Sequence, residues 1–222
     1  DGSFENLSFS SINEDQANVI YRPIHELPDI RWKDLGEHLS QTITNLSKDE
    51  EVLYAEILDD FEAGTYLAAT KLGQIKRFER KEFTPWRTYK SKSVKYAKLK
   101  DDSDFIVTVT PIQLDDIMII TQKGYALRFN LDDVPVLGAR AAGVKAMNLK
   151  NGDKIKSAFF VNSNSWYLLT QRAFIKRVKT DDIPTTSRAN RGLQVLRTLK
   201  TNNHTVFAAG LINSTADLSA LT

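Results

Sequence analysis

Short apolar strands alternate with polar turns along most of the chain. The runs "TYLAAT" (65–70), "DIMIIT" (116–121) and "WYLLT" (166–170) each precede a three-residue turn and a second short strand, which reads "QIKRF", "YALRF" or "FIKRV". Runs this short, with glycine in two of the three turns, indicate β-hairpins. Ala173 replaces the glycine in the last turn, so we expect no positive φ at that position.

The hairpins recur with a period of about fifty residues. The arginine of each second strand falls at Arg77, Arg128 and Arg177, and "NVIYRPIHELP" places Arg22 in the same column. The intervals between these arginines are 55, 51 and 49 residues, which indicates an internal repeat.

A second strand–turn–strand pattern follows in each period. It reads "LSQTITNLSKDEEVLYAEIL", "SVKYAKLKDDSDFIVTVTPI", "GVKAMNLKNGDKIKSAFFVN" and "LQVLRTLKTNNHTVFAAGLI", with one leucine in register in every copy. The polar segments between the strands are rich in Asp, Asn and Gly, as turns are. We therefore predict a second hairpin in each period. Each period then supplies about four strands, the size of one blade in a radially repeated β architecture.

The predicted fold class is all-β, with four-stranded blades packed side by side into a propeller-like disc. Packing of this kind covers the faces and edges that a single sheet would expose. We predict one domain over 1–222, with approximate blades at 1–64, 65–113, 114–163 and 164–213. The opening segment is short and polar, and "INSTADLSALT" adds no further hairpin. Either the ring is open or residues outside this sequence complete it.

Each arginine of the column is followed four or five residues later by an acid and then by a proline. Side chains alternate along a strand, so Ile75 and Arg77 share one face while Lys76 and Phe78 share the other. Lys76 and Lys176 then remain available to an outside partner. We expect an arginine–carboxylate pair to close the corner of each blade: Arg22 with Glu26, Arg77 with Glu82, Arg128 with Asp133, and Arg177 with Asp182.

The formal net charge of +2 hides a strong asymmetry. Residues 1–62 contain 15 acids and 4 bases, whereas residues 71–100 contain 11 bases and 2 acids. A basic stretch beside an acidic one favours a polyanionic partner that approaches one side of the protein. A solvated, lysine-rich surface is the alternative interpretation.

The residues of an enzyme or metal site are missing. The three histidines have no metal-ligand spacing, and no glycine-rich nucleotide loop is present. Four Asp-Asp pairs lie at expected turns, where we interpret them as turn and cap residues. We predict no catalytic residues, no metal and no cofactor in this chain. Without an apolar run near twenty residues, a leader or a cysteine, the sequence favours a cytoplasmic protein.

Basic residues gather in the linkers "RTYKSKSVKYAK" (87–98), "GARAAGVK" (138–145) and "SRANRGLQVLR" (187–197). In a ring of blades these linkers would form a belt of positive charge on one rim. Spaced lysines and arginines suit phosphates, and with no recognition helix we expect sequence-tolerant binding of bent or wrapped duplex. The candidate DNA-binding residues are Lys76, Arg87, Lys90, Lys92, Lys95, Lys123, Arg140, Lys145, Lys176, Arg188 and Arg191.

"YLAATKLGQIKRFERKEF", "GYALRFNLDDVPVLGARAAGVKAMNLKNGD" and "LLTQRAFIKRV…SRANRGLQVL" resemble the C-terminal repeats of type IIA topoisomerase A subunits. The resemblance covers roughly residues 18–212. It implies a β-pinwheel, a disc whose blades exchange strands and whose basic rim binds and bends DNA. The Gln-Arg-Arg-Gly-Gly-Lys-Gly box of gyrase A subunits is missing, and "RANRGLQV" (188–195) is the nearest fragment.

The missing box points to the topoisomerase IV branch of the family rather than to gyrase. Two segments resemble the Gram-positive members of that branch: "NVIYRPIHELPDIRWKDLGEHLSQTITN" and "FTPWRTYKSKSVKYAKLKDD". The resemblance implies a non-catalytic domain of an ATP-dependent isomerase that decatenates daughter chromosomes and relaxes supercoils. Its partners would be double-stranded DNA, the rest of the A subunit, and the ATPase B subunit in an A2B2 holoenzyme. Mg²⁺ and ATP would belong to other parts of that enzyme. Such an enzyme would be cytoplasmic and nucleoid-associated, and peripheral contact of the holoenzyme with the membrane is compatible with it.

A protein-interaction scaffold built from propeller-like blades is the alternative function. The charge distribution discriminates between the two, because a scaffold does not require a net +9 within thirty residues whereas a DNA-binding rim does.

Overall fold

The computed structural model describes most of the chain. Contacts divide it into two compact units: unit 1 holds 1–68, 76–111 and 136–143, and unit 2 holds 69–75, 112–135 and 144–222. The described residues are 5–12, 16–41, 48–49, 51–58, 63–83, 93–161 and 164–212.

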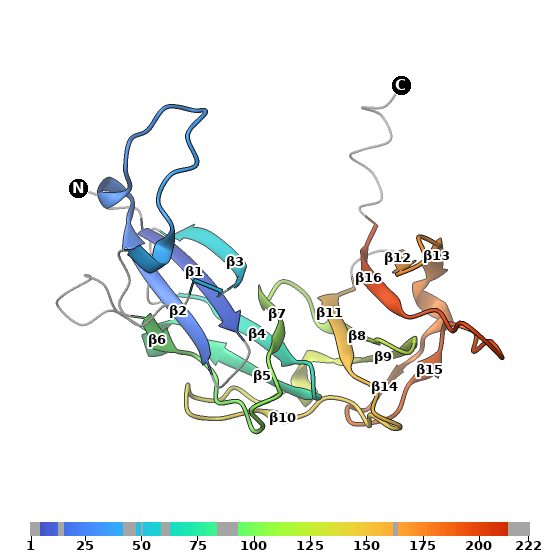
Figure 1. Cartoon of the computed structure of the whole chain (residues 1–222). Coiled ribbons are helices and arrows are strands. Elements are labelled where there is room, and N and C mark those ends of the chain that lie inside the picture. The colour runs from blue at the N-terminus through green and yellow to red at the C-terminus, as the bar shows by residue number, and fades with distance from the viewer. Residues whose placement is uncertain are drawn as a thin grey trace. The chain divides into compact units, whose positions relative to one another are not determined.

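Strands make up nearly all the regular structure, which confirms the predicted all-β class (Figure 1). The helical segments of the described residues are five 3₁₀ turns, four of which directly follow the arginine-bearing strands. Those four are η1 (Ile24–Glu26), η3 (Arg80–Phe83), η4 (Leu131–Asp133) and η5 (Thr180–Asp182), and η2 is Leu39–Gln41. The longer strands are β1 (Glu5–Ile12), β2 (Gln16–Pro23), β3 (Glu51–Leu58), β4 (Thr65–Thr70), β5 (Gln74–Glu79), β7 (Ile106–Pro111), β8 (Asp116–Thr121), β9 (Tyr125–Asn130), β11 (Ile155–Phe160), β12 (Ser165–Thr170), β13 (Ile175–Lys179) and β16 (Val206–Leu211).

Four short strands lie in the linkers between repeats: β6 (Ser93–Lys95), β10 (Val144–Lys145), β14 (Thr185–Thr186) and β15 (Leu193–Gln194). The sheets have the strand orders β3-β1-β2-β6, β10-β5-β4-β7, β11-β8-β9-β14 with β15 also on β9, and β13-β12-β16. Three linkers therefore leave their own repeat and pair with the repeat before it.

This exchange corrects the prediction of a second hairpin in each period. β6 pairs with β2, β10 with β5 and β15 with β9, whereas the strands that follow them remain in their own sheets. In the last three copies both predicted strands form, but the two belong to different sheets. Residues 42–47 of the first copy lie outside the described residues.

The exchanged strands meet equivalent positions of the repeat. In each case the first residue of the exchanged strand pairs with the residue two before the arginine of the column, so the register is the same. The paired positions are Ile20 with Ser93, Ile75 with Val144, and Ala126 with Leu193.

The same hydrogen bond from backbone to a threonine side chain closes each of the three hairpins. The Oγ1 atoms of Thr70, Thr121 and Thr170 accept a hydrogen bond from the N–H four residues later, at 3.0, 3.0 and 3.2 Å. Ala173 of the last turn has a φ of 60°, so the prediction of no positive φ there was wrong. The tight turn requires a left-handed residue, and alanine adopts that conformation at a cost of about 1–2 kcal/mol.

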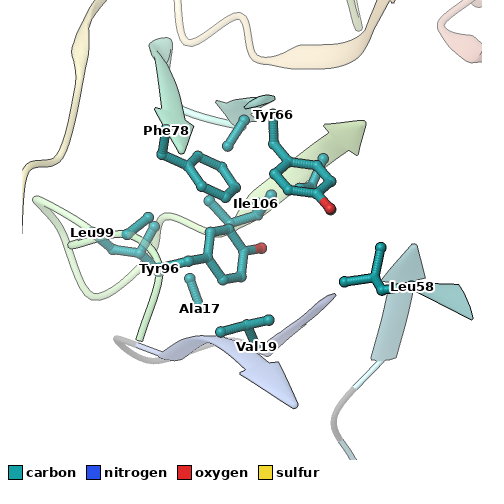
Figure 2. Close-up of a cluster of buried hydrophobic side chains, with 11 residues drawn as sticks. Ala17, Val19, Leu58, Tyr66, Phe78, Tyr96, Leu99 and Ile106 are labelled. Atoms are coloured by element: carbon teal, nitrogen blue, oxygen red, sulfur yellow. The ribbon is translucent and has the colours of Figure 1, made fainter. Parts of the chain in front are cut away.

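The core of unit 1 centres on three aromatic rings (Figure 2). Phe78 stacks on Tyr66 and on Tyr96, with ring centroids 5.4 Å apart in both pairs. Leu58 of β3 and Ile106 of β7 belong to the same cluster, so residues from two sheets bury one another's apolar surface.

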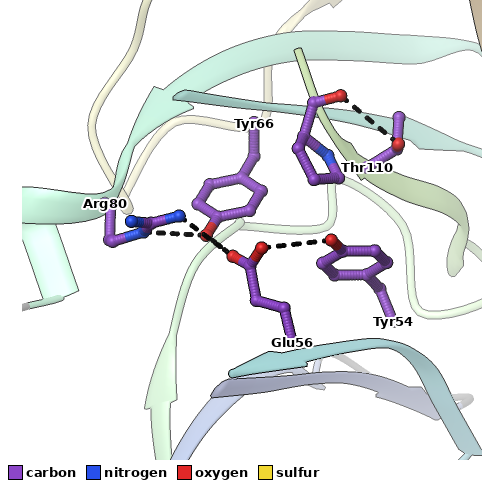
Figure 3. Close-up of polar contacts among 6 residues, drawn as sticks. Tyr54, Glu56, Tyr66, Arg80 and Thr110 are labelled. Atoms are coloured by element: carbon purple, nitrogen blue, oxygen red, sulfur yellow. Dashed lines mark hydrogen bonds and ion pairs between the residues drawn. The ribbon is translucent and has the colours of Figure 1, made fainter. Parts of the chain in front are cut away.

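A polar cluster lies beside this core (Figure 3). The Glu56 carboxylate accepts hydrogen bonds from the hydroxyls of Tyr66 and Tyr54 and pairs with Arg80 at 3.0 Å, while Arg80 Nε donates to the Tyr66 hydroxyl at 2.9 Å. Burial, reinforced by Glu56, raises the pKa of Tyr54 to about 12. Within unit 1 the cluster joins β3 to Tyr66 of β4 and to Arg80 of η3.

Unit 2 has a core of its own around Trp166, which is fully buried together with Met118, Ile120 and Leu168. Phe159 of β11 packs against the indole with ring centroids 6.0 Å apart. Met118 and Ile120 of β8 and Trp166 and Leu168 of β12 all belong to this cluster, because every second side chain of a strand lies on the same face.

Candidate nucleic-acid interface

The linkers that carry the candidate DNA-binding residues are fixed by backbone pairing at their ends. A glycine with positive φ precedes two of the exchanged strands: Gly143, with φ 102°, before β10, and Gly192, with φ 80°, before β15. A Cβ atom at Gly192 would overlap the carbonyl of Ala126 on β9. The sequence repeats this glycine at a 49-residue interval, which was the signal for its role.

In unit 1 the segment 136–143 is attached to β5. Leu137 N donates to Arg77 O at 2.8 Å, Val136 forms a parallel bridge with Arg77, and Ala141 N donates to Gly138 O at 3.1 Å. Arg140 lies exposed on this held segment. Lys95, at the end of β6, is exposed as well. Both residues present positive charge from backbone that neighbouring strands hold in place.

Lys76 is not a surface lysine, which corrects the prediction that it is available to an outside partner. Its side chain is 1% exposed, and its Nζ atom donates to Gly138 O at 3.0 Å. The ring of Phe78 lies 5.6 Å from the Nζ atom, as the alternation of side chains predicts. Burial lowers the pKa of Lys76 to about 8, and the nearby Glu82 carboxylate opposes that shift. Because the linker covers it, Lys76 anchors the loop of Arg140, and its ammonium group is not exposed to a DNA phosphate.

In unit 2 Arg188 connects the two neighbouring linkers. Its guanidinium donates to the backbone oxygens of Lys145 and, at 3.0 Å, of Asp133. Two backbone bonds run parallel to it: Ala189 N donates to Ala146 O at 2.9 Å, and Asn148 N donates to Asn190 O at 2.8 Å. Lys145 is exposed beside this junction, where its Nζ atom donates to the Asn148 side chain at 3.2 Å.

The other predicted basic residues of unit 2 are distributed along the same linker and turns. The Arg191 guanidinium lies 4.1 Å from the centre of the Tyr125 ring, in cation–π geometry. Lys123 and Lys176 are exposed, although each Nζ atom donates to a backbone oxygen, of Asn151 and Val195 respectively. These backbone bonds hold the ammonium groups at defined positions on the surface.

One arginine–carboxylate pair differs from its prediction. Arg128 pairs with Asp116 at 2.7 Å instead of Asp133. Arg128 stands opposite Met118 in the ladder, so Asp116 is its diagonal neighbour across the β8–β9 pair. The sequence carried this signal in the pairing of β8 with β9, which the spacing along the chain does not show.

The remaining arginines of the column have different surroundings. Arg177 lies exposed on β13, whose outer side has no neighbouring strand among the described residues. The pairs Arg77–Glu82 and Arg177–Asp182 stay predictions. The side chain of Arg22, and with it the pair to Glu26, lies outside the described residues, as do Arg87, Lys90 and Lys92.

No group of three or more metal-ligating side chains gathers within the described ranges. No helix among the described residues is long and apolar enough to cross a membrane.

The comparisons with known proteins point to one family. The chain matches the family described as "DNA gyrase C-terminal domain, beta-propeller" over residues 15–59, 65–113, 115–162 and 164–213. It is 66% identical to the A subunit of DNA topoisomerase 4 from Streptococcus pneumoniae over 93% of this chain and 25% of that protein. The corresponding protein of Bacillus subtilis is 40% identical over 88% of this chain and 25% of that protein. The chain thus spans about a quarter of the length of these relatives.

Solved structures agree. This chain superposes on the crystal structure of a C-terminal domain of DNA topoisomerase IV with a TM-score of 0.85 and 38% sequence identity. The match covers 94% of this chain and 64% of the chain in that structure. A DNA gyrase A C-terminal domain has a TM-score of 0.72 at 24% identity, over 96% of this chain and 67% of that chain, a likeness of fold alone. With exchanged strands, a fifty-residue repeat and a matching profile over all four repeats, the chain belongs to the DNA gyrase C-terminal domain family of beta-propellers.

Proposed function

We propose that this chain is the non-catalytic DNA-binding domain of a topoisomerase IV A subunit, and that it engages duplex DNA through its linkers. The observation that carries the proposal is the way basic side chains are held there. Lys95 and Lys145 occupy the final positions of two exchanged strands, and both are exposed. Arg188 and Arg191 extend the set along the next linker.

Such an arrangement suits phosphates better than base edges. The linkers offer ammonium and guanidinium groups on extended backbone, and the described residues include no α-helix to enter a groove, so binding would tolerate any sequence. Affinity would come from the release of counterions and would fall steeply with salt. Charge on several successive linkers would favour a bent duplex, at an elastic cost of about 1–6 kcal/mol for a bend of 40–90°.

Within the enzyme, the domain would hold the duplex segment that is transported. Strand passage, decatenation of daughter chromosomes and supercoil relaxation would depend on the rest of the A subunit, and on the ATPase B subunit in an A2B2 assembly. Mg²⁺ and ATP would act in those other parts, and this domain would need no cofactor. The proposed location is the cytoplasm, on the nucleoid.

The proposal is tested by a salt titration of the chain's affinity for random-sequence linear duplex, with energy transfer between the duplex ends as a readout of bending. We expect a steep salt dependence and a shortened end-to-end distance. Tight binding without shortening would remove the bending and keep the binding. No binding at low salt would contradict the proposal and leave the interaction scaffold as the better account.

A further inference from the structure

The segment that follows β2, residues 24–41, is here called the Trp32 loop (Figure 1). It carries several large apolar side chains that are exposed. Trp32 is 90% exposed and Leu35 is fully exposed. Leu27 and Ile30 are also exposed, at 41% and 43%. Four large apolar side chains within nine residues form a larger cluster than the single exposed residues that any protein surface carries.

The backbone of the Trp32 loop makes local bonds that shape it. Asp34 N donates to Arg31 O at 2.9 Å, and Gln41 N donates to His38 O at 2.9 Å. Gly36 has a φ of 78°, and a Cβ atom there would stand 3.5 Å from the side chain of Ile30. The loop thus turns so that these polar backbone groups are used internally while the indole of Trp32 faces solvent.

The charge of the Trp32 loop is unsuited to DNA. Residues 24–41 contain four acids and two bases, a net charge of −2 before the histidines are counted. The Lys33 ammonium lies over the Trp32 ring, 5.2 Å from its centre, in cation–π geometry. Tryptophan beside acids is instead typical of a protein–protein contact whose partner has an apolar recess with a basic rim.

The position of the loop identifies the occupant. Glu5 pairs with Pro23, so polypeptide preceding β1 joins unit 1 beside the residue from which the Trp32 loop departs. The relatives are about four times as long as this chain, and the family is a C-terminal domain. The preceding part of the same polypeptide is therefore the protein surface at the highest effective concentration near Trp32.

We propose that the Trp32 loop is the docking surface by which this domain binds the preceding part of its own A-subunit polypeptide. Trp32 and Leu35 enter an apolar recess there, and the acids of the loop face basic side chains around it. Docking fixes the orientation of the domain on the enzyme. The inference rests on family membership and does not depend on whether the linkers bind DNA.

The test uses the full-length A subunit with a photo-crosslinking benzoylphenylalanine in place of Trp32, and a matched protein with the same group in place of Phe207. Phe207 is 60% exposed and lies in unit 2. We expect the group at position 32, and not at 207, to crosslink to peptides that precede this domain, within one polypeptide on a denaturing gel. Crosslinks from 32 only to the B subunit, only between two copies of this polypeptide, or to nothing would overturn the proposal.

A second measurement separates docking from folding. The full-length double variant Trp32→Ser, Leu35→Ser should keep the thermal unfolding midpoint of the domain, because both side chains are exposed. The distance distribution between spin labels on the domain and on the preceding part should broaden at least twofold. An unchanged distribution would overturn the proposal, and Phe207→Ser serves as the control that leaves it narrow.

Discussion

The hairpins β8–β9 and β12–β13 of unit 2 have nearly the same sequence pattern but different burial. β9 is enclosed, with Ala126, Leu127 and Phe129 at 0–2% exposure, whereas Ile175 of β13 is 69% exposed. β9 has β8 on one side and β14 and β15 on the other. β13 has β12 on one side and no strand on its outer side among the described residues.

The difference shows that the exchanged strand, rather than the hairpin itself, completes each core. Both hairpins join an apolar first strand to a second strand that carries an arginine in the same column. The enclosed side chains of β9 acquire their burial from a linker more than fifty residues further along the chain. Burying one such aliphatic side chain contributes about 1.5–3 kcal/mol, so the exchange contributes substantially to the stability of each repeat.

The largest expected effect comes from breaking the exchange at β15. Gly192→Ala places a Cβ atom against the Ala126 carbonyl at a φ of 80°, and should lower the free energy of unfolding by about 3 kcal/mol. Chemical denaturation measures it. Gly152→Ala is the matched control, because its φ is 70° but nothing lies within 4 Å. The control should lose only about 1 kcal/mol, and equal losses would show that contact with β9 is unimportant.

The next test concerns the residue before the arginine of the column. β9 has the buried Leu127 there, whereas β5 has the buried Lys76. Folding lowers the pKa of Lys76 from 10.5 to about 8 through burial. Between these values the unfolded chain binds the proton and the folded chain does not, so stability rises with pH, by about 2 kcal/mol from pH 8 to pH 10. Lys76→Met should abolish that rise. Parallel pH profiles for the two proteins would contradict the burial of a titrating lysine.

A smaller loss is expected at the arginine of β9, and a still smaller one at its equivalent on β13. Arg128→Met leaves Asp116 half-buried without its partner and should cost about 1–2 kcal/mol. Arg177→Met should change the free energy of unfolding by less than about 0.5 kcal/mol, because an exposed arginine gains little from its neighbours. The two variants are compared in the same urea titration, and equal costs would refute the importance assigned to the Arg128–Asp116 pair.

The smallest expected effect concerns the turns of the two hairpins, where Ala173 of the β12–β13 turn stands in place of Gly124 of the β8–β9 turn. Ala173→Gly removes the left-handed strain at φ 60° and should stabilise the protein by about 1 kcal/mol. Part of that gain is lost to the greater entropy of glycine in the unfolded chain. Thermal unfolding measures the change. A destabilised Ala173→Gly would show that the turn does not hold alanine under strain.

The repeat, the hairpins and the all-β class could be predicted from the sequence because they depend on local alternation. The first strands of the three hairpins agree with the predicted runs to within one residue, and β4 and β8 agree at both ends. The exchange could not be predicted in the same way. A linker strand of two or three residues has no periodicity to detect, and its partner is set by packing between repeats.

The basic residues of the candidate site also differ in how well the sequence predicts them. Lys95, Arg140 and Lys145 are exposed as expected, since charged residues in polar linkers seldom find a core. Lys76 could not be assigned correctly, because only the covering linker, through Gly138, distinguishes it from the exposed Lys176 in the same column.

Charge on the linkers, rather than charge in general, is what we propose binds duplex DNA. The comparison that tests this sets the triple variant Lys95→Gln, Arg140→Gln, Lys145→Gln against the triple variant Lys100→Gln, Lys150→Gln, Lys200→Gln. The control lysines are exposed and recur every fifty residues at turns outside the linkers, and both variants lose three positive charges.

The measurement is the slope of log affinity for random-sequence duplex against log salt concentration. The linker variant should lose about one unit of slope for each phosphate contact removed, up to about three, while the control keeps the wild-type slope. A control that loses as much slope as the linker variant would contradict the proposed role of the linkers.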